Sequence, residues 1–332
     1  MGFTGVTHLE ILRILKENEG SFVSGAALAQ RLAISRPGVW KHIKKLKEMG
    51  YDIRSLSRRG YSLVDVPDSL TREEIVPGLK TKWLGHSYHY LGMLESTNDY
   101  ALRLAVDGAP HGTVVVAEKQ TKGRGRLRRE WISHPGLGIY LSILLRNPLP
   151  IQIASQSTYI GSLALVETLR EEFGVRASIK WPNDVLINGR KAAGILTETQ
   201  SDQDFSRFIV MGIGINVNHT RDDLGGPFRY PATSIAMELG VPVKRQRVLV
   251  EFLGQFERQY DRFQQGGISV LIPEIQAHSE ILGKIITVAT ADREIVGRAE
   301  GFTPEGALLL AAKDGSREIL WAGDVLLVEG AV

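Results

Sequence analysis

One basic, helix-forming segment sets the architecture of the N-terminal region, and it reads Ile34-Ser35-Arg36-Pro37-Gly38-Val39-Trp40-Lys41-His42-Ile43-Lys44-Lys45-Leu46. Ser35 can cap a helix, and Pro37 fits the first helical turn, where a missing N–H costs little. The apolar face holds Val39, Ile43 and Leu46, and the polar face holds Arg36, Lys41, Lys44, Lys45 and Lys47. We therefore expect an amphipathic helix that runs to Met49, with Gly50 as its terminating glycine.

The sequence on both sides of this segment predicts the rest of a small module. Before it, His8 to Glu17 repeats apolar residues three and four apart, and Ser24 can cap a short helix from Ala26 to Leu32. After it, Tyr51 to Val64 reads as a β-hairpin with Ser57-Arg58-Arg59-Gly60 at its tip. Together these elements describe a winged helix-turn-helix, whose basic helix enters the major groove while the hairpin tip lies beside phosphate or the minor groove.

This module is predicted to bind DNA, because its basic segment resembles the recognition helices of winged-helix transcription regulators. The candidate DNA contacts are Ser35, Arg36, Lys41, His42, Lys44, Lys45, Arg58 and Arg59. We expect Trp40 to pack between helices, and His42 either to touch DNA or to support that packing. One module makes few contacts, so specific binding is expected to need a dimer. The alternative is a winged helix that contacts protein.

The charge of the chain is unevenly distributed, which supports a nucleic-acid module joined to a different body. The 332 residues carry a formal net charge of +3. Residues 1–62 hold eleven Lys and Arg against five Asp and Glu, so this segment is +6 and the remainder is −3. A second basic cluster lies between residues 119 and 129, where six cations occur without an acid. A solvated helix face is the alternative explanation of the first cluster.

The composition excludes several classes of protein. The chain has no cysteine, which rules out a disulfide framework, a thiol nucleophile and a cysteine zinc site. No apolar run approaches the roughly 18 residues that a membrane span needs. The first residues show neither a basic region nor a clean apolar region typical of a signal peptide. We therefore expect a cytoplasmic protein that does not bind membranes.

Two polar segments in the middle of the chain are candidates for a ligand site. Ser96-Thr97-Asn98 opens a helical stretch that runs from Asp99 to Val106, so these side chains either cap the helix or hold a polar head group. A strand from Thr113 to Glu118 leads into the Gly/Arg loop, which we define as residues 121–131. Its glycines let backbone N–H groups approach an anion, and its arginines can clamp phosphate. The like charges of this loop should repel one another when no ligand is bound. A loop rich in glycine and arginine is also common in RNA-binding proteins.

Further candidates follow in strand-like segments. We expect a strand at 138–145, a helix from Ser155 to Phe173, a hairpin at 179–190, and strands at 191–198 and 208–217. Asn183 and Asp184 follow Pro182 at a strand break, where they either aim into a site or serve as turn residues. Lys191 is the first residue of an apolar strand. It either keeps an edge strand from pairing with another chain or neutralises negative charge that develops on a carboxylate or phosphate.

The ordered set of these motifs is similar to the catalytic core of biotin–protein ligases. The motifs are Ser96-Thr97-Asn98, Gly123-Arg124-Gly125-Arg126 with Trp131, Trp181-Pro182-Asn183-Asp184, Lys191-x-x-Gly194-Ile195-Leu196 and Gly212-x-Gly214-x-Asn216. With the winged helix in front, the chain most resembles the bifunctional kind, the biotin operon repressor and biotin–[acetyl-CoA-carboxylase] ligase. One departure is Arg128, which stands where family members commonly have a glycine.

The resemblance implies a role for each motif residue. Biotin would be bound by Ser96, Thr97, Asn98, Gln120, Gly123, Arg124, Gly125, Arg126, Lys191 and Gly194, and ATP by Arg126, Trp131, Asn183 and Asn216. Arg124 and Arg126 would clamp the phosphate, and Lys191 would stabilise charge at the acyl phosphate. Asp184 would assist the incoming lysine or the metal.

The resemblance also implies substrates and partners. The substrates would be biotin and ATP, with Mg²⁺ accompanying the ATP and no tightly bound metal held by the protein. The partners would be the biotin carrier domain of acetyl-CoA carboxylase or a related carboxylase, operator DNA, and a second copy in a ligand-promoted homodimer. Two alternatives are a regulator with a catalytically idle core and a lipoate-type acyl ligase without an operator function.

The C-terminal region is predicted to be a small β domain. A helix from Val248 to Gln264 ends near Gly266-Gly267, and five short strand-like runs follow residue 281. Their number and spacing suggest an SH3-like barrel. Asp324 is a weak candidate for a ligand contact there, and a turn residue is the favoured interpretation. We therefore predict an α+β protein with a winged helix-turn-helix at 1–65, a class II synthetase-like mixed sheet with helices at 66–275 and the barrel at 276–332.

Overall fold

The computed structural model describes residues 7–146, 156–202, 205–225, 231–312 and 315–328. The chain divides into two compact units, Met1–Ser69 and Leu70–Val332, and each is described by itself. Within the described residues, no helix combines the length and the apolar character needed to cross a membrane.

The N-terminal unit is the predicted winged helix-turn-helix. It contains α1 (Thr7–Glu17), α2 (Gly25–Arg31), α3 (Arg36–Glu48) and a hairpin of β1 (Asp52–Leu56) and β2 (Gly60–Asp65). The Oγ atoms of Ser24 and Ser35 accept hydrogen bonds from the N–H groups of Ala27 and Gly38, so both predicted caps are confirmed. Gly50 has a φ of 96°, as a terminating glycine requires.

The expected packing of Trp40 between helices is wrong. Trp40 is 60% exposed, because it lies about 100° around α3 from Val39, whose face turns into the core. The buried residues of α3 are Val39, Ile43 and Leu46, as the periodicity predicted. His42 is half-buried and its ring stacks on that of His8 at 6.3 Å between centroids, which is the packing role considered for it.

A seven-stranded mixed sheet forms the centre of the second unit. Its strands are β3 (Tyr88–Leu94), β4 (Thr113–Gln120), β5 (Gly138–Leu145), β6 (Ala177–Lys180), β7 (Asp184–Ile187), β8 (Arg190–Asp202) and β9 (Phe205–Asn216). The strand order is β3-β4-β5-β9-β8-β7-β6. Only the β3–β4 pair is parallel, and the other pairs are antiparallel. The α+β class and the mixed sheet are therefore confirmed.

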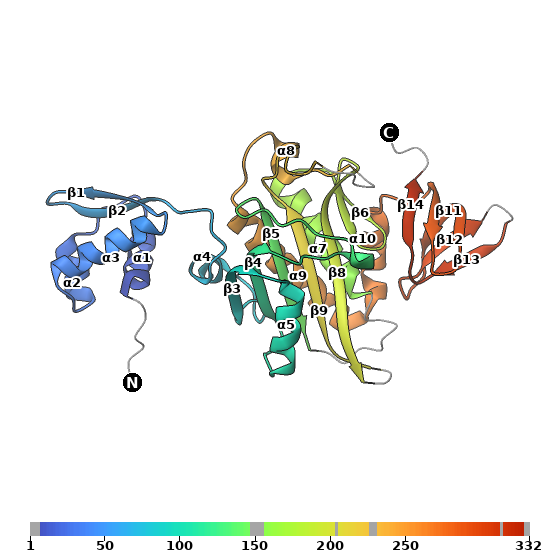
Figure 1. The fold of residues 1–332 in the computed structure, drawn as a ribbon, viewed down its shortest axis with the longest axis horizontal. Helices are drawn as coiled ribbons and strands as arrows, with labels where there is room; N and C mark the ends of the chain where they lie inside the picture. Colours follow the sequence, from blue (N-terminus) through green and yellow to red (C-terminus); the bar gives the residue numbers. More distant parts are fainter. Residues whose placement is uncertain (1–6, 147–155, 203–204, 226–230, 313–314, 329–332) are drawn as a thin grey trace. The chain divides into compact units, whose positions relative to one another are not determined.

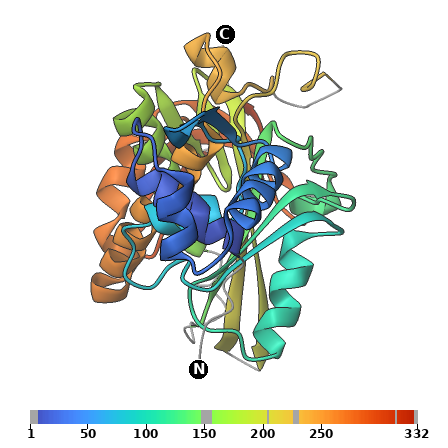
Figure 2. The same cartoon turned by 90° about the vertical axis from the view of Figure 1, so that its left-hand side faces the viewer.

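Helices cover both faces of this sheet. On one face, α5 (Thr97–Val106) packs Ala101 and Ala105 against Val115 and Val210. On the other face lie α7 (Ser157–Phe173) and α9 (Arg245–Gly266), and Figures 1 and 2 show α9 and α5 on opposite sides of the strands. The start predicted for the α7 helix, Ser155, lies outside the described residues. Short helices are α4 (Arg72–Ile75), α8 (Ile235–Leu239) and α10 (Ile272–Ala277), with 3₁₀ turns η1 (Val76–Gly78), η2 (Arg126–Arg128) and η3 (Ile268–Val270).

The five predicted C-terminal strands are confirmed as one antiparallel sheet. They are β10 (Ile285–Ala289), β11 (Glu294–Phe302), β12 (Leu308–Ala312), β13 (Arg317–Leu320) and β14 (Asp324–Val328), in the order β13-β12-β11-β10-β14. The Tyr159 Oη on α7 donates to the Gly306 carbonyl at 2.9 Å. This bond helps to fix the small sheet to the central domain, beside the site described next.

Candidate active site

A cavity of about 230 Å³ lies where the central sheet, the Gly/Arg loop and the turn before β14 meet. Of the residues predicted to bind ligand, the cavity is lined by Ser96, Thr97, Asn98, Gln120, Arg124, Gly125, Arg126, Trp131, Asn183, Asp184, Lys191, Gly194 and Asn216. Gly123 does not line it but supports the loop, because the Trp131 N–H donates to its carbonyl at 2.9 Å. The structure thus brings motifs that are far apart in sequence to one place.

One end of the cavity is built from uncharged polar groups. The Ser96 Oγ accepts from the Asp99 N–H at 3.3 Å, so Ser96 is the N-cap of α5 as well as a lining residue. The Thr97 N–H and hydroxyl both donate to the Gln120 Oε1, at 2.8 and 3.1 Å. These bonds orient the Gln120 amide and leave this end of the cavity neutral.

Both the nitrogen and the oxygen of the Asn98 side-chain amide are hydrogen-bonded within the protein. Its Nδ2 donates to the Glu198 carboxylate at 2.6 Å, and its Oδ1 accepts from the Ser142 Oγ at 2.6 Å. A Cβ on Gly212 would lie 2.3 Å from that Oδ1, so only glycine fits there. Asn98 therefore positions Glu198, a charged residue of β8 that sequence reasoning did not single out.

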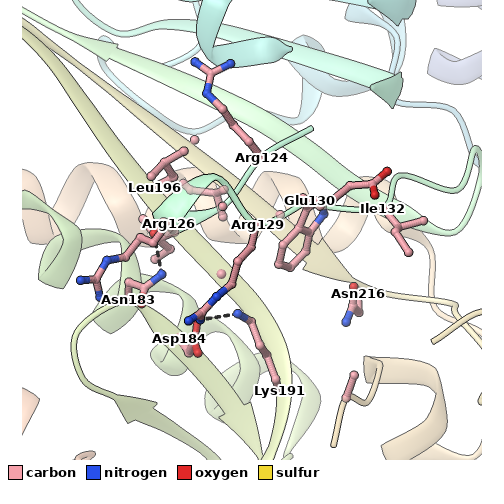
Figure 3. A pocket seen from close by; sticks show the side chains of 18 of the residues that line it. Arg124, Arg126, Arg129, Glu130, Ile132, Asn183, Asp184, Lys191, Leu196 and Asn216 are labelled. Atoms are coloured by element: carbon pink, nitrogen blue, oxygen red, sulfur yellow. Dashed lines mark hydrogen bonds and ion pairs between the residues drawn. The ribbon is translucent and has the colours of Figure 1, made fainter. Parts of the chain in front are cut away.

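The guanidinium of Arg124 lies away from the other cations of the loop. It forms a bidentate ion pair with Asp99, at 2.6 and 2.8 Å, and also binds Glu198 at 3.0 and 3.1 Å. The hydrogen bond from Arg124 holds the pKa of Asp99 below its usual value, and the Asp99 bond raises the pKa of Arg124. Figure 3 shows this side chain pointing away from Asp184 and Lys191.

Two other loop arginines, Arg126 and Arg129, reach the C-terminal domain. Arg126 donates to the Gly323 carbonyl at 3.0 Å and to the Asn183 Oδ1 at 3.4 Å, and burial lowers its pKa. Arg129 forms an ion pair with Asp324 at 2.7 Å. Asp324 therefore lines the site, the less favoured of the two interpretations of its sequence context.

Arg128 adopts a backbone conformation that favours glycine. Its φ is 56°, and that of the preceding Leu127 is 54°, so both residues lie in the left-handed region. Each such residue costs on the order of 1 kcal/mol. A glycine at position 128 would therefore adopt this turn with less strain than arginine does.

The centre of the cavity is a cluster of opposite charges. The Lys191 Nζ lies 2.7 Å from one carboxylate oxygen of Asp184, and the Nζ of Lys180 lies 4.0 Å from the other. A register shift between β7 and β8 brings Lys191 opposite Leu186, close to Asp184. Asn183 is held by a bond from its Nδ2 to the Ile195 carbonyl at 3.1 Å. Sequence reasoning missed Lys180, although it stands directly before the Trp181-Pro182-Asn183-Asp184 motif.

The third part of the cavity offers a flat aromatic surface. The Trp131 indole lies against Gly194 and Gly214, where added Cβ atoms would come within 3.0 and 2.3 Å of the ring. Asn216 donates from its Nδ2 to the Thr233 carbonyl at 3.1 Å. His219 also lines this part, and burial and the neighbouring His134 lower its pKa to about 4, so it is neutral near pH 7. Within the described ranges, no group of three or more His, Asp or Glu could hold a metal ion.

Comparisons with known proteins agree with this geometry. Residues 90–216 match the biotin/lipoate A/B protein ligase family, residues 7–62 an HTH domain, and residues 281–328 the biotin protein ligase C-terminal domain. The bifunctional ligase/repressor BirA of Bacillus subtilis (strain 168) is 36% identical over 318 residues, covering 96% of this chain and 98% of its own. The protein of that name from Escherichia coli (strain K12) is 30% identical, with coverages of 93% and 94%.

A solved structure is similar to the second unit. The biotin protein ligase from Aquifex aeolicus in complex with biotin and ATP is 28% identical, with a TM-score of 0.62, and the match covers 72% of this chain and 97% of that one. The full-length relatives and the matching domains lead to one conclusion: the chain belongs to the family of bifunctional biotin protein ligases and biotin repressors.

Proposed function

We propose that this protein activates biotin with ATP as biotinoyl-5′-AMP and transfers biotin to a lysine of a carboxylase carrier domain. The same adenylate acts as corepressor for genes of biotin biosynthesis and transport. One observation carries the proposal: a single cavity joins a neutral polar end, a charged centre where Lys180 and Lys191 flank Asp184, and an aromatic surface against two glycines. These parts suit a ureido ring, a reacting phosphate and a nucleoside.

The first step joins two anions, so the cavity must supply positive charge. A carboxylate oxygen of biotin attacks the α-phosphorus of ATP and forms an oxygen–phosphorus bond. The bond from that phosphorus to the α–β bridging oxygen breaks, and diphosphate leaves with this oxygen. We assign the stabilisation of the reacting phosphate to Arg126 and Lys191, which both line the cavity. Mg²⁺ arrives bound to the ATP phosphates, and the covering loop protects the mixed anhydride from water.

The second step transfers the acyl group. The amine of the acceptor lysine attacks the acyl carbon, the carbon–oxygen bond to phosphate breaks, and AMP leaves. The attacking amine must lose a proton, and the Asp184 carboxylate at the cavity centre can accept it. Residues 66–275 carry this chemistry, residues 1–65 read DNA, and residues 276–332 help to close the site. A protein with such partners works in the cytoplasm.

The ligase activity is tested by mixing the protein with biotin, MgATP and a biotin-acceptor domain. We expect a covalent mass gain on one acceptor lysine, and none when ATP is left out. Binding of biotin without any mass gain would instead support a regulator with an idle core.

The repressor activity follows from linkage between ligand binding and dimerisation. If the adenylate favours a dimer, two winged helices can read two half-sites at once. We expect operator affinity to rise when biotin and ATP are both added. Equal affinities with and without them would remove the corepressor role.

Gly214→Ala is expected to weaken ATP use selectively. Its Cβ would lie 2.3 Å from the Trp131 ring, so the indole must leave the surface assigned to the nucleoside. We expect KM for ATP to rise by about tenfold or more, while KM for biotin changes little. The matched control is Gly92→Ala on β3, where an added Cβ meets nothing within 4 Å. Equal KM values for ATP in both variants would contradict the assignment.

Lys41→Ala tests the DNA-binding face of α3. Lys41 is exposed on the side opposite the buried Val39 and Ile43. Removing one phosphate contact should reduce the slope of log affinity against log salt by about 0.9 on any duplex. The control is Arg13→Ala on α1, whose guanidinium is already paired with Glu10 and Glu17. An unchanged salt slope for Lys41→Ala would place DNA on another face.

A further inference from the structure

The Arg124 guanidinium is bound by two carboxylates that come from different elements. Asp99 lies in the first turn of α5, and Glu198 lies on β8. Four oxygen–nitrogen distances between 2.6 and 3.1 Å join them to Arg124. The three side chains are between 28% and 35% exposed, so water screens the ion pairs only in part.

Asp99 and Glu198 are both positioned by neighbouring polar groups. The Asp99 N–H is capped by Ser96, and the N-terminus of α5 favours a negative charge at this position. Glu198 accepts the Asn98 Nδ2, and Asn98 is itself fixed by Ser142. The two acids therefore form a fixed acceptor for the Arg124 guanidinium, next to cavity residues Asn98 and Arg124.

Arg124 lies at the base of a short hairpin, which the Gly/Arg loop forms beside the cavity. The Gly125 N–H donates to the Arg129 carbonyl at 2.7 Å, and Arg124 and Glu130 form a β-bridge. Arg126 and Trp131, which face the cavity, are joined to Arg124 through this short hairpin. Fixing Arg124 therefore also fixes Arg126 and Trp131 beside the cavity.

We propose that Asp99 and Glu198 are positioning residues that latch the Gly/Arg loop closed through Arg124, and so set how long the adenylate stays bound. This inference rests on the proposed ligase function. In it, Arg124 serves as the anchor of the loop, while Arg126 and Lys191 contact the reacting groups. The latch also compensates the repulsion expected among the loop cations.

The latch is tested with Asp99→Asn, Glu198→Gln and the double variant. Each protein is loaded with labelled biotin and MgATP, freed of excess substrate, and followed for release of biotinoyl-AMP, which hydroxylamine traps. We expect release about tenfold faster from each single variant and faster still from the double variant, as loss of charge-assisted bonds predicts. Labelling of a bystander protein such as serum albumin should rise in parallel.

A matched control uses another ion pair to which the Gly/Arg loop contributes one residue. Glu95→Gln removes one acid from the Lys122–Glu95 pair, which joins at 2.7 Å but is more than 60% exposed on both sides. We expect its release rate to equal that of the unmodified protein. Equal acceleration by Glu95→Gln would show a general charge effect and overturn the latch.

A second measurement does not depend on catalysis. Trypsin should cut the ligand-free latch variants within residues 122–129 faster than it cuts the unmodified protein or Glu95→Gln. Arg124→Lys, which keeps the charge but loses the bidentate geometry, serves if an acid variant does not fold, and we expect intermediate rates. Unchanged cleavage and release would overturn the latch alone. Absence of any adenylate from the unmodified protein would overturn the proposed function instead.

Discussion

Lys191→Ala reduces biotinylation of the carrier domain by about 10²–10³-fold, the effect typical of losing one preorganised group that stabilises the transition state. Lys191 is expected to act on the reacting phosphate, since its Nζ lies in the cavity centre beside Asp184 and 5.6 Å from the centre of the Trp131 ring. The measurement is the initial rate of covalent mass gain at saturating biotin and MgATP.

The control for this variant is Lys284→Ala. Lys284 also forms an ion pair at 2.7 Å, with Glu280, and its side chain is similarly exposed, but it does not line the cavity. Its rate should match that of the unmodified protein. Normal turnover by Lys191→Ala would refute the role assigned to Lys191.

Arg245→Ala lowers the free energy of unfolding by about 3–5 kcal/mol, because it leaves a buried carboxylate without its counter-charge. Arg245, at the start of α9, is 2% exposed and pairs with Glu118 of β4 at 2.9 Å. It also donates to the Gly138 carbonyl at 3.0 Å. Urea unfolding followed by circular dichroism measures the loss.

Arg247→Ala, two residues further along α9, is the matched control for Arg245→Ala. Its pair with Glu172 joins at 3.1 Å, but the Arg247 side chain is 57% exposed. We expect a loss of about 0–1 kcal/mol, as for exposed ion pairs. Similar losses of unfolding free energy in the two variants would show that the buried Arg245 pair stabilises the fold no more than an exposed pair does.

The local elements were predictable because their signals lie within a few residues of one another. The signals of the caps Ser24 and Ser35, of the α3 periodicity and of the short C-terminal strand-like runs each lie within one short segment. The motif residues could also be grouped, since their order along the chain is specific to one family. Individual roles stay predictions, although of the residues predicted to act in catalysis or to bind biotin or ATP, all but Gly123 line one cavity.

The residues that sequence reasoning missed or ranked too low depend on contacts across the fold. A turn is the favoured interpretation of Asp324 until the Gly/Arg loop brings Arg129 to it, 195 residues away in sequence. Glu198 looks like an ordinary strand residue until Arg124 and Asn98 reach it. Trp40 was misplaced for another reason: a large aromatic residue beside a buried position suggests burial, but a step of 100° turns it outward.

The contacts of Arg126 with Gly323 and of Arg129 with Asp324 tie the cover of the active site to the turn before β14, far along the chain from the central sheet. During translation, residues 323 and 324 leave the ribosome after the whole central sheet. The sheet can therefore fold while the Gly/Arg loop still lacks these two contacts. A chain cut short before residue 323 lacks them permanently.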